Sequence, residues 1–328
     1  MTEVAIKPLV IANAAFSNNI IQGPLAGISS APFRLLSWRY SKPAFSYTEM
    51  VSCKTLIHHR NISELSLVRK LPGEGPVGVQ LSGTCPKEVA EAVKIVTNVG
   101  ADLIDLNCGC PVKKIRRRGA GSAHLSQPTK LYQLIHAMKQ NTSLPVSIKI
   151  RVDGASDDAF NQEIAKAVSD AGADFLIVHG RHWQDDYSVT CHYDQIHFFV
   201  DALNVPVIGN GDIACASSLM RMLQTGCAGV MVSRAGVGRP WLIGNMIAEI
   251  QGGEIYRPTS EEAGKVFIEH VRLLADFSGS EVLALLQARK FCKYYARNIP
   301  DRAAFCVAVN ACDNVKDLED IYYTFFRD

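Results

Sequence analysis

The sequence lacks any long uninterrupted apolar run, although hydrophobic residues make up 48% of its 328 residues. A membrane-spanning helix needs roughly 18 or more such residues in succession, so we expect no membrane span. The apolar stretch before Phe16 is short and is broken by Lys7 and Pro8, which is not typical of a secretion signal. We interpret this stretch as the approach to a first strand and expect a cytoplasmic protein.

Cysteine pairs at disulfide or zinc-site spacing are also missing. The 10 cysteines are scattered, and several lie among apolar residues, so a disulfide framework is not expected. Cys108 and Cys110 with His124 form a zinc alternative, but the usual wider pair spacing and a second ligand pair are absent. We therefore expect no metal.

An excess of charge of either sign is absent too. Lys and Arg number 34 and Asp and Glu 32, a formal charge of +2, so the total gives no argument for nucleic acid. Charged residues make up only 20% of a strongly apolar chain, which excludes a disordered protein. The length suits two domains or one large barrel with an appendage, and the composition favours a metabolic enzyme.

Short apolar runs of the strand type alternate with helix-like segments along the first three quarters of the chain. Alternation of this kind requires parallel strands, and eight of them close most simply as a (β/α)₈ TIM barrel over residues 1–252. An open doubly wound sheet is the structural alternative. The runs begin at Ile20, Ala44, Pro76, Leu103, Pro145, Phe175, Val205 and Gly229, with helical segments at 87–99, 129–141, 158–171 and 214–224.

The strand pattern stops after Gly252 and Gly253. Thr259 and Glu262 then have the spacing of a capping box, and apolar residues recur at helical intervals with breaks near Gly279, Pro300 and Asn314. We predict a C-terminal all-helical bundle domain over residues 253–328.

Polar residues at the strand ends are the candidates for function, because active sites of such barrels lie at the carboxyl ends of the strands. Taken singly, each also has a structural interpretation: His179 could be a core histidine and Lys149 an ion-pair partner. The glycine-containing loops 209–212 and 233–238 follow the last two strands, where phosphate sites form, although their glycines could simply permit tight turns. Lys149 would face the barrel centre and stabilise a reduced flavin or an enolate. Flavin is favoured because no carboxylate and metal cluster accompanies the loops.

Residues 104–125, after the fourth strand, contain the densest group of reactive and basic side chains. Pro111 disfavours a helix at Cys110, so this thiol belongs to an extended loop over the barrel mouth, as nucleophile or acid. A buried inert thiol is the alternative, more fitting for Cys108. The basic groups could follow a phosphate backbone or be solvated turns. They are Lys113, Lys114, Arg116, Arg117 and Arg118, and, in the tail, Arg289, Lys290, Lys293 and Arg297.

An ordered series of motifs covers nearly the whole chain. It includes PLAGISSAPFR at 24–34, GVQLSG at 78–83, DLNCGCPVKKIRRRGAG at 105–121 and VSRAGVGRPW at 232–241. In this series the chain resembles the tRNA-dihydrouridine synthase family, most of all its DusB type. The resemblance implies an FMN-dependent enzyme that uses NADPH to reduce uridines in tRNA to 5,6-dihydrouridine.

The resemblance also implies site roles, position by position. Cys110 would protonate carbon 5 of the uracil after flavin hydride reaches carbon 6, with Asn107 and Arg181 near the base. The two basic groups would contact tRNA, and we expect a monomer. FMN contacts would come from Pro24, Leu25, Ala26, Gln80, Lys149 and His179, and phosphate contacts from Asn210, Gly211, Asp212, Ser233 and Arg234.

The sequence departs from the family pattern mainly in one loop and in the tail. His182 and Trp183 replace the expected Thr-Arg, Val189 stands at a usual Gly, and FCVAVN at 305–310 lacks the paired arginines. Two rival functions therefore stay open. One is a small-molecule FMN barrel oxidoreductase of the dihydroorotate dehydrogenase or ene-reductase type, and the other a tRNA-binding protein with decayed catalysis.

Overall fold

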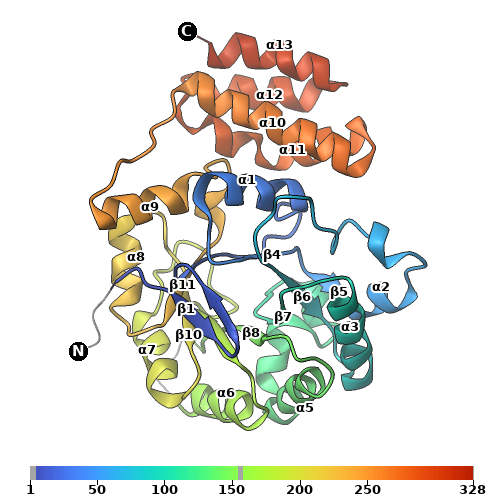
Figure 1. Cartoon of the computed structure of the whole chain (residues 1–328), viewed down its shortest axis with the longest axis vertical. Coiled ribbons are helices and arrows are strands. Elements are labelled where there is room, and N and C mark those ends of the chain that lie inside the picture. Colours follow the sequence, from blue (N-terminus) through green and yellow to red (C-terminus); the bar gives the residue numbers. More distant parts are fainter. Residues whose placement is uncertain (1–4, 154–157, 328) are drawn as a thin grey trace.

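Eight parallel strands close into a barrel in the computed structural model, which describes residues 5–153 and 158–327 (Figure 1). Around the barrel each strand pairs with the next, β11 pairs with β3, and β4 pairs with β6. The predicted TIM barrel is thereby confirmed and the open sheet is wrong. The strands are β3 (Ile20–Gln22), β4 (Ser46–Tyr47), β6 (Val77–Ser82), β7 (Leu103–Cys108), β8 (Val146–Arg151), β9 (Phe175–His179), β10 (Val207–Asn210) and β11 (Gly229–Val232).

Helices cover the outside of the barrel and fall where the periodicity placed them. Three of them, α1, α3 and α5, have proline in the first turn, a residue whose fixed φ suits that position. The outer helices are α1 (Ala31–Ser41), α3 (Pro86–Asn98), α5 (Pro128–Lys139), α6 (Ala159–Asp170), α7 (Tyr193–Ala202), α8 (Ala216–Leu223) and α9 (Leu242–Gln251). Shorter elements are β5 (Val51–Ser52) and α2 (Cys53–His58) between β4 and β6, and α4 (Lys113–Arg116) between β7 and α5.

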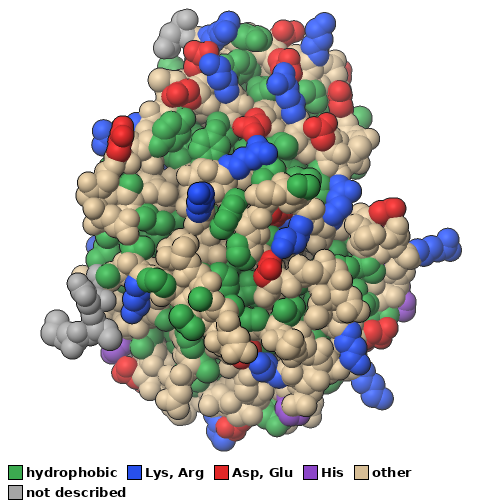
Figure 2. All heavy atoms as spheres, viewed as in Figure 1, with side chains coloured by type: hydrophobic (Ala, Val, Ile, Leu, Met, Phe, Trp, Pro, Cys, Tyr) green, Lys and Arg blue, Asp and Glu red, His purple; other side chains and the backbone are tan. Residues whose placement is uncertain are grey.

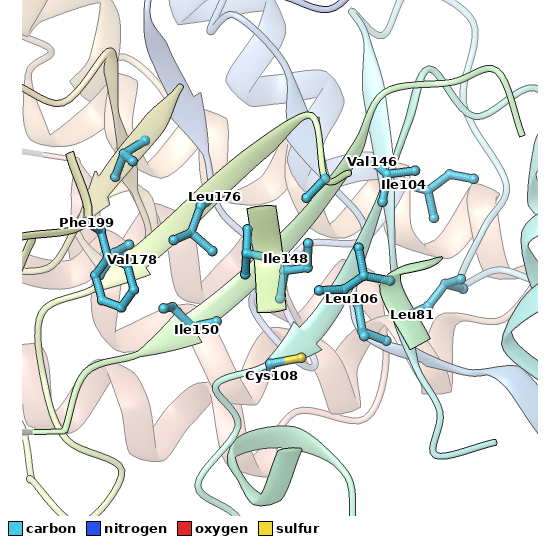
Figure 3. Packing of buried hydrophobic residues seen from close by; sticks show 14 of the residues in the cluster. Leu81, Ile104, Leu106, Cys108, Val146, Ile148, Ile150, Leu176, Val178 and Phe199 are labelled. Carbon is cyan, nitrogen blue, oxygen red and sulfur yellow. The ribbon is translucent and has the colours of Figure 1, made fainter. Parts of the chain in front are cut away.

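Side chains alternate between two environments along the central strands. Leu106, Cys108 and Ile150 belong to the apolar cluster packed with the outer helices (Figure 3). Their neighbours Asn107 and Lys149 line the barrel mouth instead, as the two-residue period of a strand requires. The same alternation therefore builds the core and delivers polar groups to one end of the barrel.

A β-hairpin of β1 (Leu9–Ile11) and β2 (Ala14–Phe16) precedes the barrel. The sequence predicts only the approach to a first strand here, and the hairpin corrects this prediction. Its turn places Ala12 at φ 50° and has no glycine, so the usual sequence signal of a hairpin is missing. Phe16 packs with Phe45 in the cluster inside the barrel, where apolar side chains fill the end opposite the polar mouth.

Four further helices stack beside α1 at the end of the chain (Figure 1). The predicted capping box is present, because Glu262 N–H donates to Thr259 Oγ1 at 3.2 Å and Thr259 N–H donates to Glu262 Oε2 at 2.7 Å. Phe267 and Phe305 share one core with Phe33 of α1. These helices are α10 (Ser260–Ser278), α11 (Glu281–Tyr295), α12 (Arg302–Ala311) and α13 (Val315–Phe326). Within the described ranges, no helix has both the length and the apolarity that crossing a bilayer requires.

Candidate active site

A cavity of about 700 Å³ opens at the carboxyl ends of the strands, and we call it the active-site cavity. Its size lies in the range of small-molecule sites. Most of the residues predicted from the sequence line it together, although they come from strands spread over the whole barrel. These are Pro24, Leu25, Ala26, Gln80, Asn107, Cys110, Lys149, His179, Asn210, Gly211, Asp212, Ser233, Arg234 and Arg297.

The loop after β7 presents one of its two cysteines to the cavity. Cys110 is half-buried and lines the cavity, whereas Cys108 is fully buried, and burial raises the pKa of the Cys108 thiol well above its usual range. Asn107 Oδ1 accepts the Cys110 N–H at 3.0 Å, and Ser122 Oγ donates to the Cys110 carbonyl at 3.1 Å. Gly121 has φ +62°, and a Cβ there would lie 2.6 Å from that carbonyl oxygen. The backbone around Cys110 is therefore held from both sides.

A buried hydrogen-bond chain supports this loop from below. Asp105 is fully buried and accepts bonds from Ser147 Oγ at 2.7 Å and Gln80 Nε2 at 2.8 Å. Gln80 Oε1 in turn accepts from Asn107 Nδ2 at 2.9 Å. Burial raises the pKa of Asp105 to about 7, and the two donors oppose that rise. Asp105 thus fixes the amide orientation of Gln80 and, through Asn107, the loop that bears Cys110.

Lys149 lies at the centre of the mouth, where its Nζ donates to Asn210 Oδ1 at 2.8 Å. Burial, and next Arg151, lower the pKa of Lys149 to about 7. His179 stands nearby on β9, and burial pushes the pKa of its imidazole well below the usual value, which keeps the ring neutral. The centre of the cavity therefore holds one amine ready to take a proton when an anion binds.

The loops after β10 and β11 form one end of the cavity, and the lining as a whole contains more cationic than acidic residues. The lining includes one acidic residue, Asp212, whose carboxylate lies 2.5 Å from Arg181 Nη2 and 3.0 Å from the Cys191 amide nitrogen. Gly211 has φ +126°, and a Cβ would lie 2.8 Å from Cys191 Sγ. This cationic end fits a phosphate, with backbone rather than the Asp212 side chain as the contact. The cationic residues of the lining are Lys149, Arg151, Arg234, Arg239 and Arg297.

Arg181 is placed differently from the other predicted substrate residue. Its side chain is 1% exposed and stands outside the cavity lining, where its Nε donates to the Val189 carbonyl at 2.7 Å. It therefore holds the loop after β9 against Asp212.

The sequence departures fall in this same loop. The guanidinium of Arg116 stacks 3.0 Å from the Trp183 ring centroid, and that of Arg234 lies 3.3 Å from the Tyr187 ring. Trp183 thus connects the β9 loop to the Cys110 loop, and Tyr187 connects it to the phosphate loop.

The predicted basic residues divide into exposed and anchored side chains. Arg289 is anchored, because its Nη2 donates to the Cys312 carbonyl at 3.2 Å, and Arg116 is held by Trp183. Arg297 lines the active-site cavity. The exposed side chains are those of Lys113, Lys114, Arg117, Arg118, Lys290 and Lys293.

Twelve residues of the cavity lining were not among the predicted site residues, and four of these have charged or aromatic side chains. Arg151 follows Lys149 at the two-residue spacing of a strand face, a signal that could have identified it. Its Nε donates to the Gly109 carbonyl at 3.1 Å and its Nη1 to the His182 carbonyl at 2.8 Å. Arg151 therefore connects the Cys110 loop with the loop after β9. Tyr187, Arg239 and Tyr294 enter from segments far apart in the chain, and no local pattern marks them.

The zinc alternative has no cluster to support it. In the parts of the chain that the structure describes, no three His, Cys, Asp or Glu side chains gather where they could hold a metal ion. Cys108 packs in the core while Cys110 lines the cavity, so the two thiols do not share one site.

The fold and the cavity together define a (β/α)₈-barrel protein with a cationic site at its mouth. Solved structures of similar shape include the old yellow enzyme homologue from Zymomonas mobilis, with a TM-score of 0.58, 11% identity, and 79% of this chain and 95% of that chain covered. A morphinone reductase variant in complex with tetrahydroNAD has a TM-score of 0.55 at 12% identity, covering 78% of this chain and 93% of that chain. At these identities the likeness concerns the fold.

Sequence comparison gives the family. The model of the dihydrouridine synthase (Dus) family matches residues 21–326, so the chain belongs to this family. Probable tRNA-dihydrouridine synthase 1 of Synechocystis is 34% identical, covering 96% of this chain and 89% of that protein. tRNA-dihydrouridine synthase B of Escherichia coli is 32% identical, covering 94% of this chain and 97% of that protein. The resemblance seen in the motifs is confirmed.

Proposed function

We propose that this protein is an FMN-dependent tRNA-dihydrouridine synthase, which reduces uridines in tRNA to 5,6-dihydrouridine with NADPH. The observation that carries the proposal is that a thiol and a group of cations line the same cavity. A thiol, Cys110, lines one part of it, and Lys149 with Asn210 and Arg234 lines another. Family membership and the names of the relatives support the same reaction.

The cavity fits a flavin mononucleotide in charge and in size. The phosphate would be held by Asn210, the Gly211 backbone, Ser233 and Arg234. The acidic residue of the lining, Asp212, is paired with Arg181, so the cations of the lining have no free carboxylate partner within it. Lys149, Gln80 and His179 would contact the ring, with Pro24, Leu25 and Ala26 beside it. When bound and reduced, FMN supplies a hydride to the pyrimidine ring.

The chain's own residues then position the uracil and provide the proton. The Cys110 thiol would give its proton to carbon 5, and solvent would reprotonate it between turnovers. Asn107 keeps Cys110 in place through its backbone N–H, at 3.0 Å. The uridine must leave its stack to enter the cavity, which costs a few kcal/mol that contacts to the RNA offset.

Recognition of tRNA would rest on local groups of cations rather than on total charge. On the face in Figure 2, Lys and Arg side chains are interspersed with Asp and Glu over the C-terminal helices. Exposed Lys113, Lys114 and Arg117 lie next to the Cys110 loop, and Lys290 and Lys293 on α11. Structured RNA is read largely by shape and phosphate, so such groups suffice. The proposal includes a monomer in the cytoplasm, where the free state of all ten cysteines is chemically stable.

A single assay separates this function from its rivals. Purified protein with FMN is mixed with NADPH, and NADPH oxidation under anaerobic conditions is followed with and without an unmodified tRNA transcript. We expect oxidation beyond one equivalent per FMN only when tRNA is present. Sustained oxidation with small enones or orotate-like acids but not tRNA would instead identify a small-molecule oxidoreductase, and tRNA binding without oxidation a binding protein.

A further inference from the structure

A second cavity of about 370 Å³ adjoins the active-site cavity. Most of its lining comes from three segments: residues 238–241 before α9, residues 256–260 leading into α10, and residues 294–299 at the end of α11 and just after it. Asn245, Ala263 and Phe326 complete the lining. Arg239, Tyr294 and Arg297 line both cavities, so these three residues form the shared wall. No role assigned above uses this second cavity.

The second cavity is cationic and has no built-in counter-ion. Arg239, Arg257 and Arg297 line it, the lining contains no Asp or Glu, and none of the three arginines forms a salt bridge within the described ranges. The Nη1 atom of Arg297 is buried without a hydrogen-bond partner there. A buried guanidinium donor without an acceptor is costly, so the arrangement favours an anionic ligand that accepts from it.

Aromatic rings form the other walls of this cavity. The Tyr256 and Trp241 rings meet edge to face with centroids 5.8 Å apart, and Tyr256 is 40% exposed. Asn245 fixes the Tyr256 backbone through two bonds, at 2.7 Å to its carbonyl and 3.0 Å from its N–H. Tyr294 stands in the shared wall, with Arg297 5.3 Å from its ring centroid. Flat rings beside guanidinium groups are the chemistry that holds a nucleotide.

We propose that the second cavity is a subsite for a nucleotide of the substrate RNA that neighbours the reduced uridine. The inference rests on the proposed function, in which the uridine occupies the active-site cavity. Because the two cavities share a wall, the nucleotide next to that uridine would lie in the second cavity. Arg257 and Arg297 bind its phosphate, and Tyr256 or Tyr294 contacts its base. A polymer suits the site better than a dinucleotide, because exposed Lys290 and Lys293 continue the positive charge along α11. A Cβ on Gly27, the residue after Ala26 of the active-site cavity, would lie 3.2 Å from Lys290 Nζ, so this charge extends to the active site.

The first test replaces Arg257, which is exposed and lines only the second cavity. In the FMN-loaded protein we expect Arg257→Ala to raise the KM for tRNA about tenfold, the effect of one charged hydrogen bond, with the KM for NADPH unchanged. The salt dependence of tRNA binding should weaken by about 0.7 to 0.9 in logarithmic slope, one phosphate contact. Arg257→Lys should retain most of the affinity. Arg60→Ala, an exposed arginine that lines neither cavity, is the matched control and should match the wild type.

The second test locates the nucleotide without requiring turnover. Ultraviolet cross-linking of the FMN-loaded protein to unmodified tRNA should join Tyr256 or Tyr294 to a nucleotide within two positions of the modified uridine. Cross-links of Tyr256 and Tyr294 only to distant nucleotides would overturn the proposal. A change in the KM for NADPH but not in the KM for tRNA in Arg257→Ala would overturn it as well. If tRNA cross-links to Tyr256 or Tyr294 but no dihydrouridine forms, the proposed function fails and the second cavity remains only an RNA-binding site.

Discussion

At the scale of single residues, the site depends on Asp105, which does not line the active-site cavity but supports residues that do. Asp105 is buried beneath Gln80, and Gln80 holds Asn107, whose side chain accepts the Cys110 N–H. Lys149 stands on the next strand in register with Asn107. The position of the Cys110 loop therefore depends on one buried carboxyl group, whose charge also opposes the lowering of the Lys149 pKa by burial.

Replacing Asp105 tests this dependence. Asp105→Ala leaves Gln80 Nε2 and Ser147 Oγ without their acceptor, so we expect about 2 to 4 kcal/mol less free energy of unfolding in urea, together with strongly reduced dihydrouridine formation. Asp105→Asn retains an acceptor for Gln80 and should remain within about 1 kcal/mol of wild type. Equal loss of activity in both variants would show that the charge, rather than the orientation of Gln80, is what matters.

The lowered pKa of Lys149 predicts pH-dependent cofactor binding. The amine of the ligand-free protein loses its proton as pH rises through about 7, so affinity for FMN should fall above that pH. Stability changes with pH in the opposite direction. The pKa of this amine is about 7 in the folded protein and 10.5 in the unfolded chain, so between these pH values the amine binds a proton on unfolding. The free energy of unfolding of the ligand-free protein therefore rises with pH across this range. Titration of FMN fluorescence from pH 6 to 9 should show the fall in wild type and a flatter profile in Lys149→Met.

The sequence predicted most of these residues for a physical reason. Side chains at the ends of barrel strands converge whatever their separation along the chain, so Gln80, Lys149 and Asn210 could be assigned to one site. Arg181 could not be placed in this way. The direction of a side chain in a loop depends on partners such as Asp212, which come near it only when the chain folds.

At the scale of elements, the loop after β9 is one of the two parts in which this chain departs from its family pattern, the other being residues 305–310 of the tail. Trp183 stacks on Arg116, Tyr187 lies under Arg234, and Arg181 anchors the loop from inside. Strand and helix positions followed from periodicity, whereas this loop and the β1–β2 hairpin have no repeating pattern from which their shapes could be predicted. The hairpin turn even uses Ala12 at positive φ, where glycine is the usual signal.

Arg181→Gln probes the loop. Asp212 then lacks its counter-ion beside the phosphate loop, and we expect FMN to bind at least tenfold more weakly, the effect of about 1.4 kcal/mol or more. The double variant Arg181→Gln with Asp212→Asn removes the unpaired charge and should recover part of the affinity. Isothermal titration of each variant with FMN measures both effects. No recovery in the double variant would contradict the electrostatic explanation.

At the scale of the whole molecule, the barrel and the C-terminal helices share one hydrophobic cluster. Phe33 of α1 and Trp241 before α9 pack with Phe267 and Phe291 of the helical part. The two cavities meet along the same boundary. This could not be predicted from the sequence, because the segments that form the second cavity are separated by tens of residues and have no common motif.

The shared cluster predicts that both parts unfold together. Phe267 is fully buried, so Phe267→Ala should lower the free energy of unfolding by about 3 to 5 kcal/mol and shift one common transition. Circular dichroism and tryptophan fluorescence should report the same midpoint. Val307→Ala, at a position that is 69% exposed, serves as the control and should leave that midpoint in place. Two separated transitions would show independent domains.

The central claim is that this chain adds two hydrogens to a uridine of tRNA with Cys110 as the proton donor. Its most direct test is mass spectrometry of nuclease fragments from unmodified tRNA incubated with the protein, FMN and NADPH. We predict a gain of about 2 Da in one fragment with wild type, and a yield at least 100-fold lower with Cys110→Ala, the loss expected for a general acid. Cys108→Ala should still give the gain. An unchanged mass with the FMN-loaded wild type would contradict the account.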